Sequence, residues 1–184
     1  FRYALTTWHR ETDAEHDFAL SKIDIEVKTT LNERRIHVIG SVTQLQPSIG
    51  RDLHLLSVQF TPAPPGTSGG QSLQSRVDHI RSRARIEGCE DQLMARLGLL
   101  GWNPIDAVNY SRQYVMRSYP SLVEVDENCP RVTRDDLVKS NPANSGRLVS
   151  VDYRINVDDL GYLSDSTEFE ELLKENVKLI GDAS

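Results

Sequence analysis

The sequence predicts an α/β or α+β domain with a mixed β-sheet, and three observations lead to this fold class. Residues 21–30 alternate apolar and charged side chains with the period of two that is typical of a strand with one buried face. Residues 72–100 instead repeat their apolar side chains at helical spacing. The expected elements then follow the order helix end, hairpin, strand, two helices, strands and helix, which favours a sheet flanked by helices.

The first seventy residues are expected to form mainly strands. Two alternating stretches are joined by the turn Asn32-Glu33-Arg34, so we expect them to pair as a hairpin. Ser41 is a suitable N-cap for a short helix, and three prolines and three glycines after Phe60 indicate a loop. The expected elements are a helix end at 3–9, a loop at 10–16, strands at 21–30, 35–39 and 53–60, a short helix at 41–46 and a loop at 61–70.

The rest of the chain is expected to begin with two helices and to continue with strands. Ser72 is a reasonable N-cap for the first helix, and Gly101 lies near the stop of the second. The expected elements are helices at 72–86, 90–100 and 167–179, β-rich stretches at 110–126 and 147–157, and a loop at 141–146. We therefore divide the chain into a core over residues 1–104 and a β-rich C-terminal extension over residues 105–184, packed on the same domain.

Composition indicates a globular chain and says little about nucleic acid. The 184 residues are 38% hydrophobic and 26% charged, which suits one domain with a sizeable core. The net charge of −6 argues mildly against a dedicated nucleic-acid binder, but all of the acidity lies in residues 101–184. No apolar run approaches the roughly 20 residues of a membrane span, and no signal peptide opens the chain. Cys89 and Cys129 stand apart as ordinary thiols, so we expect a cytoplasmic protein.

The stretch from Asp17 to Lys28 holds the residues best suited to chemistry. In a strand Glu26 and Lys28 project from the same face, and Asp24 shares that face. Hydrolysis of a phosphodiester needs a divalent cation, an activated water and compensation of the phosphate charge. Asp17 and Glu26 offer hard oxygen ligands suited to Mg²⁺, and the carbonyl of Val27 is a third candidate ligand. Lys28 can orient or deprotonate the water and stabilise the phosphate.

An alternative stays open for this stretch, because an acid-x-Lys pattern on an exposed strand face is more often solvated surface. Two observations favour a site. The upstream acid, Asp17, lies at hairpin distance, and three charges follow one another beside the most apolar strand expected. Repulsion between the two carboxylates is tolerable when a cation lies between them.

The spacing Asp17-x8-Glu26-x-Lys28 resembles the signature of the PD-(D/E)xK nucleases, and the likeness extends well beyond those three residues. It is similar to bacterial PD-(D/E)xK-motif proteins found with restriction and phage-defence genes, over about residues 3–165. The residues that carry the likeness are Trp8, His16 to Phe18, Ile25 to Thr30, His37, Ser41, Gln44-Leu45, Gly69 to Ile80, Leu97, Gly101-Trp102, Tyr114, Pro130 to Leu137 and Val151 to Leu160.

The resemblance implies a restriction-endonuclease-like core with a central mixed β-sheet flanked by helices, plus the β-rich C-terminal extension. It implies that Asp17 and Glu26 bind Mg²⁺, with Mn²⁺ as a substitute, and that Lys28 is the catalytic lysine. Gln44 would be the helix glutamine that many such nucleases place beside the site. A surface polar residue in a short helix is the alternative for Gln44.

Several basic residues are candidates for contact with the substrate. His16 and His37 could touch phosphate, although a lone histidine is more often structural. Arginine makes bidentate bonds to phosphate oxygens, so Arg76 and Arg83 on the helix after Ser72 are candidates to bind DNA. The alternative for that helix is a solvated amphipathic surface.

The chain departs from the family at its front. Relatives carry an N-terminal helix with a glutamate that completes the metal site, and no such helix precedes Phe1. We therefore expect a missing segment, another chain or another domain to supply that group. The proline before the acid is also replaced, because Ala14-Glu15-His16 precedes Asp17.

These features together lead us to expect a Mg²⁺-dependent DNA endonuclease that acts on double-stranded DNA. It would be the nuclease component of a restriction or phage-defence system, with an ATPase, a methyltransferase or a specificity module selecting the target. Two alternatives remain open. One is a non-catalytic DNA-binding or assembly subunit on a nuclease scaffold, and the other is a stand-alone DNA-repair nuclease or junction resolvase.

Overall fold

The computed structural model describes residues 1–8 and 15–177, and the chain forms two compact units. Unit 1 contains residues 1–8 and 60–117, and unit 2 contains residues 9–59 and 118–184. Each unit is thus built from two separate stretches of chain. This division differs from the boundary at residue 104 expected from the sequence, and that boundary stays a prediction.

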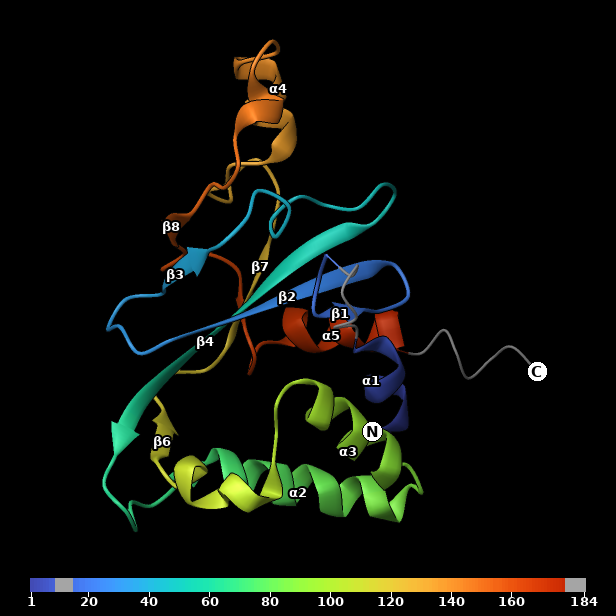
Figure 1. The fold of residues 1–184 in the computed structure, drawn as a ribbon, viewed down its shortest axis with the longest axis vertical. Helices are drawn as coiled ribbons and strands as arrows, with labels where there is room; N and C mark the ends of the chain where they lie inside the picture. Colours follow the sequence, from blue (N-terminus) through green and yellow to red (C-terminus); the bar gives the residue numbers. More distant parts are fainter. Residues whose placement is uncertain (9–14, 178–184) are drawn as a thin grey trace, which may run out of the picture. The chain divides into compact units, whose positions relative to one another are not determined.

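Unit 2 is built on a mixed sheet, as the sequence predicted. β1 (Phe18–Ala19) pairs antiparallel with β2 (Ile23–Thr30), and β2 runs parallel to β4 (Asp52–Ala63) along its whole length (Figure 1). On the other side β4 pairs antiparallel with β7 (Ser121–Glu124), which in turn pairs with β9 (Tyr162–Leu163). The strands expected at residues 21–30 and 53–60 are therefore confirmed, and the second of them is central.

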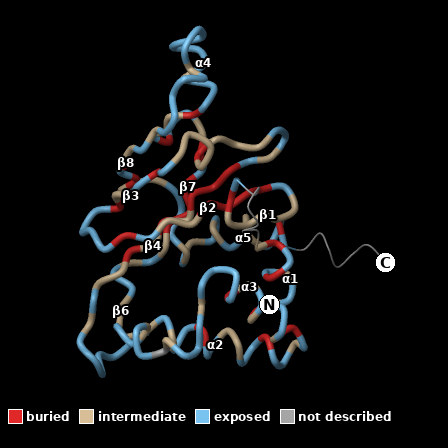
Figure 2. The backbone as a smooth tube through the Cα atoms, viewed as in Figure 1, coloured by how far each residue is buried: buried red, intermediate tan, exposed pale blue. Residues whose placement is uncertain are grey.

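Both faces of this sheet are covered. On one face Ile23 and Ile25 pack with apolar side chains of α5 (Thr167–Val177). On the other face the larger core of unit 2 joins Leu53 and Leu55 to residues of a second, two-stranded sheet made of β3 (Ile36–Ile39) and β8 (Tyr153–Asn156). Figure 2 shows β2, β7 and the first half of β4 as largely buried. The charged side chains of β2 therefore point into a covered interior.

The hairpin expected for residues 21–39 is wrong. β2 pairs with β4 along one edge and with β1 at Asp24 and Ile25 on the other, and β3 belongs to a separate two-stranded sheet. β3 instead pairs antiparallel with β8, with Ile36 opposite Asn156 and Ile39 opposite Tyr153. Its buried side chains then close over the face of the main sheet.

The short helix expected at residues 41–46 is also wrong, because that segment forms bends and a turn. The backbone N–H of Gln46 donates to the carbonyl of Thr43, which closes a single turn. Pro47 disfavours helical geometry at the residue before it, and the hydroxyls of Ser41 and Thr43 bond to each other rather than capping a helix. Gln44 therefore lies on a turn.

The sequence reading missed α4 (Arg134–Ser140). Its N-cap is Thr133, whose side chain accepts from the N–H of Asp136 while the carboxylate of Asp136 accepts from the N–H of Thr133. This reciprocal capping box is visible in the sequence as Thr-x-x-Asp and could have predicted the helix. A single 3₁₀ turn, η2 (Ser145–Arg147), follows it.

Unit 1 is mainly helical. It contains α1 (Arg2–Thr7), α2 (Leu73–Ile86), α3 (Glu90–Leu99), η1 (Pro104–Tyr110) and the strands β5 (Gln71–Ser72) and β6 (Gln113–Met116). Ser72 caps α2 through the N–H of Ser75, and Leu93 and Leu97 of α3 lie in the core, so these sequence predictions are confirmed. No helix in the described part of the chain is long and apolar enough to span a membrane.

Gly161 provides a test of how β9 is seated on β7. Its φ is +78°, and an added Cβ would lie 2.3 Å from the carbonyl oxygen of Leu122. We expect Gly161→Ala to lower the free energy of unfolding by more than about 1 kcal/mol, because both the backbone conformation and the space favour glycine. Urea denaturation would measure it.

Gly146 offers a matched control for that substitution. Its φ is unremarkable and an added Cβ would meet nothing within 4 Å. We expect Gly146→Ala to change stability by less than about 0.5 kcal/mol. Equal effects of the two substitutions would contradict the close packing assigned to Gly161.

Candidate active site

Asp17 is held beside the centre of β2. Phe18 pairs with Ile25 in the antiparallel β1–β2 register, and continuing that register by one residue sets Asp17 opposite Glu26. The backbone N–H of Val27 donates to Oδ2 of Asp17 at 2.8 Å. The carboxylate thus takes the place that a strand carbonyl would otherwise occupy, and this fixes it next to the Glu26–Lys28 segment.

Glu26 and Lys28 form an ion pair on the inward face of β2. Nζ of Lys28 lies 3.0 Å from Oε1 of Glu26, and the two side chains are only 19% and 6% exposed respectively. In the parallel register with β4, Glu26 lies opposite Leu55 and Lys28 opposite Ser57. The pair therefore lies between the apolar Leu55 and the polar Ser57 of the neighbouring strand.

Gln44 completes the surroundings of the lysine. Nζ of Lys28 donates to Oε1 of Gln44 at 3.0 Å, and the same oxygen accepts from the backbone N–H of Gly40 at 3.0 Å. The neighbouring Leu45 is fully buried in the core and anchors the turn. The structure thus brings Gln44 to the lysine as the sequence suggested, although on a turn and not on a helix.

The carbonyl of Val27 points to the edge of β2 where Asp17 lies. Within a strand the N–H and C=O of one residue face the same edge, and the N–H of Val27 faces Asp17. The pairs between β1 and β2 end at Phe18 and Ile25, so Val27 lies beyond the paired part of that edge. This position is compatible with its predicted role as a backbone ligand.

The chemistry of these groups suits a hard divalent cation. The β1–β2 register sets the carboxylates of Asp17 and Glu26 at opposite positions beside the Val27 carbonyl, and Mg²⁺ is commonly bound through one or two carboxylates with water completing its shell. Among the described residues no group of three or more His, Cys, Asp or Glu side chains is arranged to hold a metal ion. The roles of Asp17, Glu26 and the Val27 carbonyl as metal ligands stay a prediction.

Arg51 is a residue of the site region that the sequence analysis did not single out. Its guanidinium donates to Oδ1 of Asp24 at 2.9 Å and to the backbone carbonyls of Leu20, Ser21 and Ile23. These bonds tie down the turn between β1 and β2, and with it the strand that leads from Asp17. No local pattern around Arg51 indicates this role, because its partners lie about thirty residues earlier in the chain.

His16 occupies a buried position and not an open one. Its Nδ1 lies 3.7 Å from Oδ2 of Asp24, and its side chain is 3% exposed. Burial lowers the pKa of His16 below its ordinary value, which outweighs the opposite effect of the Asp24 charge. This environment favours a structural role, and the predicted contact with phosphate stays a prediction.

His37 lies beside Lys28 in a second buried network. Its Nε2 lies 2.7 Å from the hydroxyl of Ser57, and the guanidinium of Arg35 donates to that hydroxyl and to the Ser57 carbonyl. Burial lowers the pKa of His37 to about 4, and the charges of Arg35 and Lys28 act in the same direction. His37 is therefore neutral at physiological pH and supports β3 against β4.

Arg76 and Arg83, the predicted DNA contacts, are exposed on α2 in unit 1. Their neighbours Arg81 and Arg85 both pair with Glu90 at the start of α3, with nitrogen–oxygen distances of 2.6 and 2.7 Å. The exposure of Arg76 and Arg83 is compatible with contact to a phosphate. Their role in binding DNA stays a prediction.

Residues 2–158 match a family described as "Putative PD-(D/E)XK family member, (DUF4420)". The chain belongs to this family. Comparison with curated proteins and comparison with solved structures give no match. Membership in a PD-(D/E)XK family indicates a nuclease-like function, and members of such families generally use divalent metals. The match covers both the Asp17–Lys28 segment and the β3–β8 sheet, so it includes every residue that shapes the site described above.

The depressed pKa of His37 predicts that stability falls in mild acid. Above pH 6.5 the imidazole is neutral in both the folded and the unfolded chain. Between about pH 6.5 and 4 only the unfolded chain binds this proton, so the contribution of His37 lowers the free energy of unfolding by up to about 1.4 kcal/mol per pH unit, and this contribution levels off below pH 4. Urea denaturation over this pH range would measure the slope.

A pair of substitutions isolates the contribution of His37. We expect His37→Gln, which cannot titrate, to reduce the slope by about one proton whatever its effect on absolute stability. His79→Gln, at an exposed position on α2, is the control and should leave the slope unchanged. An unaltered slope in His37→Gln would contradict the assignment of a buried neutral imidazole.

Proposed function

We propose that this protein is a divalent-metal-dependent DNA endonuclease. The observation that carries the proposal is that Lys28 lies between Oε1 of Glu26 and Oε1 of Gln44, each at 3.0 Å, while Asp17 is bound to the same strand through the N–H of Val27. The family match supports the nuclease-like part of this proposal. We propose double-stranded DNA as the substrate and Mg²⁺ as the preferred ion, with Mn²⁺ as a substitute.

The roles of the side chains follow from their chemistry. A bound divalent cation would supply Lewis acidity at the scissile phosphate, and Asp17, Glu26 and the carbonyl of Val27 would hold it. Lys28 carries its charge to the oxygens on which negative charge develops as water attacks phosphorus and the P–O bond to the leaving oxygen breaks. Gln44 is a positioning residue, because it accepts from Lys28 and so limits where the ammonium group can point.

One alternative has an observation in its favour. The described residues supply two acidic side chains to the site and not three. A non-catalytic subunit that binds DNA on a nuclease scaffold would need no further acid. A stand-alone DNA-repair nuclease is the remaining alternative, and branched against linear substrates would separate it from the first proposal.

We further propose that the protein serves a restriction or phage-defence system in the cytoplasm. The sequence offers no obvious recognition motif, so an ATPase, a methyltransferase or a specificity module would select the DNA that is cut. The two cysteines of the chain, Cys89 and Cys129, are both buried free thiols, which agrees with a reducing compartment.

Replacing Lys28 tests the catalytic proposal. We expect Lys28→Ala to slow metal-dependent nicking of supercoiled plasmid by at least about 100-fold, because the charge that stabilises the reacting phosphate is lost. Lys174→Ala is the control, since Lys174 also forms an ion pair with a glutamate but at an exposed position on α5. The assay compares initial rates with Mg²⁺, with Mn²⁺ and with a chelator.

Folding has to be controlled in this test, because Lys28→Ala leaves the buried carboxylate of Glu26 without its ion-pair partner. Unfolding midpoints of both variants show whether the assay temperature leaves them folded. Equal nicking by wild type and Lys28→Ala would overturn the proposed role of the lysine. No metal-dependent nicking by the wild type would overturn the proposal that the chain is an endonuclease by itself and favour the non-catalytic alternative.

The substitution Asp17→Asn distinguishes between two roles of Asp17, a metal ligand and an acceptor that only supports the fold. The amide oxygen of asparagine can still accept from the N–H of Val27, but the negative charge is gone. We expect this variant to keep an unfolding midpoint close to that of the wild type and to lose Mn²⁺ binding measured by isothermal titration calorimetry. Mn²⁺ affinity equal to that of the wild type would exclude Asp17 as a ligand.

A further inference from the structure

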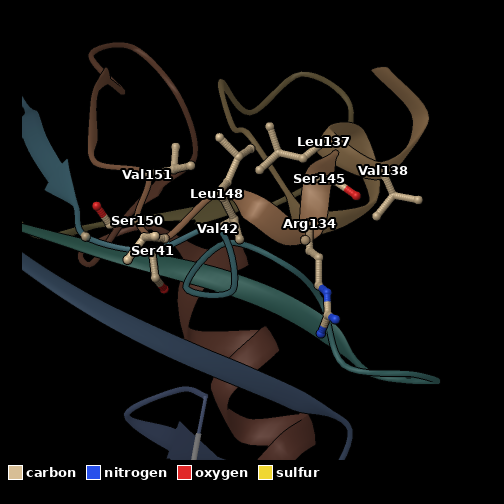
Figure 3. A pocket seen from close by; sticks show the side chains of 12 residues that line it. Ser41, Val42, Arg134, Leu137, Val138, Ser145, Leu148, Ser150 and Val151 are labelled. Atoms are coloured by element: carbon tan, nitrogen blue, oxygen red, sulfur yellow. The ribbon is translucent and has the colours of Figure 1, made fainter. Parts of the chain in front are cut away.

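A groove of about 400 Å³ opens in unit 2 next to the turn that carries Gln44 (Figure 3). Gly40, Ser41 and Val42 form one wall, and α4 with residues 145–151 forms the other. Its volume lies within the range of roughly 300–1,000 Å³ that is typical of small-molecule sites. The groove is therefore large enough for a ligand and not merely a packing defect.

The lining combines apolar surface with hydroxyl groups and one cation. Val42, Leu137 and Leu148 lie near one another in the middle of the view in Figure 3, and Arg134 extends from α4 at the rim. The hydroxyl groups come from Ser41, Ser145 and Ser150, and no carboxylate belongs to the lining residues. An apolar ring with hydrogen-bonding edges that is attached to an anion would match this combination. A nucleotide has this chemistry.

The groove and the candidate active site share one turn. At one end of the turn Gln44 accepts from Lys28 and from Gly40, which lines the groove. At the other end the side-chain oxygen of Gln46 accepts from the backbone N–H of Arg134, the first residue of α4. A ligand in the groove would therefore contact the segment that positions the lysine.

We propose that this groove receives a nucleobase turned out of the DNA strand next to the scissile phosphate. This inference rests on the proposed nuclease function, because the DNA that supplies the base is the DNA held at Asp17, Glu26 and Lys28. Proteins that extrude a base stack it between apolar or aromatic side chains and read its edge by hydrogen bonds. Val42 and Leu148 would contact the faces of the base, and the serine hydroxyls its edge.

Gly146 allows the groove to be filled without strain. It lines the groove, its backbone is not in the left-handed region, and an added Cβ meets nothing within 4 Å. Gly146→Phe should therefore fold and occupy the space meant for the base. Gly98→Phe is the matched control, because Gly98 is equally unobstructed and exposed on α3 but does not line the groove.

The experiment first maps cleavage on plasmid DNA and then uses duplexes with 2-aminopurine at each position around the mapped cut. The fluorescence of 2-aminopurine rises when the base leaves the stack. Asp17→Asn is the background, so that the duplex is bound without being cut. We expect the fluorescence to rise at one position of the duplex when Asp17→Asn binds it. This rise should be absent in Asp17→Asn/Gly146→Phe and present in Asp17→Asn/Gly98→Phe. Gly146→Phe alone should cut about tenfold or more slowly than Gly98→Phe, the factor that corresponds to 1.4 kcal/mol.

Other outcomes overturn the proposal in distinguishable ways. Normal cutting with no fluorescence rise at any position, or equal cutting by Gly146→Phe and Gly98→Phe, would reject the base site and leave the nuclease proposal intact. The absence of metal-dependent cutting would reject the proposed function and this inference together. The four deoxynucleoside monophosphates, with deoxyribose 5-phosphate as the baseless control, form a separate titration. If the monophosphates bind, Gly146→Phe blocks that binding, and no duplex shows a rise in fluorescence, then the groove is a site for a free nucleotide and not for a base of the DNA.

Discussion

The ion pair between Glu26 and Lys28 is the interaction on which the arrangement of unit 2 depends. β2 is covered on both faces, so the ion pair is largely shielded from solvent. Withdrawing two charges from water costs several kcal/mol per ion, and their mutual attraction offsets this only when further hydrogen bonds satisfy them. Gln44 provides such a bond to Lys28, and Gly40 fixes Gln44 in turn. The polar groups around β2 thus provide the hydrogen bonds that the buried ion pair needs.

The parallel pairing of β2 and β4 supplies those groups. A parallel pair requires the chain to return across the sheet before the second strand begins, and residues 31–51 make this return. The return segment carries His37, which bonds Ser57, then the turn with Gln44, and it ends at Arg51, which binds the β1–β2 turn. The hairpin expected for residues 21–39 would have made β3 an edge neighbour of β2 within the sheet. Because β3 pairs with β8 instead, His37 lies against Ser57 of β4 on the face that carries the charged side chains.

Local patterns explain which features the sequence could predict. The alternation over residues 21–30 depends on neighbouring residues alone, and it predicted both β2 and the face shared by Glu26 and Lys28. The partner of β3 and the burial of His16 depend on residues far along the chain, so periodicity carried no information about them. Arg51 is the clearest case, because its role exists only through backbone carbonyls that have no sequence signature. The capping box of α4 is a local pattern, so the sequence did contain the information that predicts this helix.

The inward face of β2 also shows a conflict between stability and chemistry. Asp24 and Glu26 are both buried two residues apart on one face, and well-packed apolar side chains at such positions are often as stable or more stable. Arg51 offsets the charge of Asp24, Lys28 offsets that of Glu26, and the backbone N–H of Val27 donates to Asp17. A cation held by Asp17 and Glu26 would bind the folded chain, where these two residues are brought together by the β1–β2 register, and not the unfolded one. Metal binding and folding of unit 2 are then linked, so a cation bound at these carboxylates would raise the free energy of unfolding.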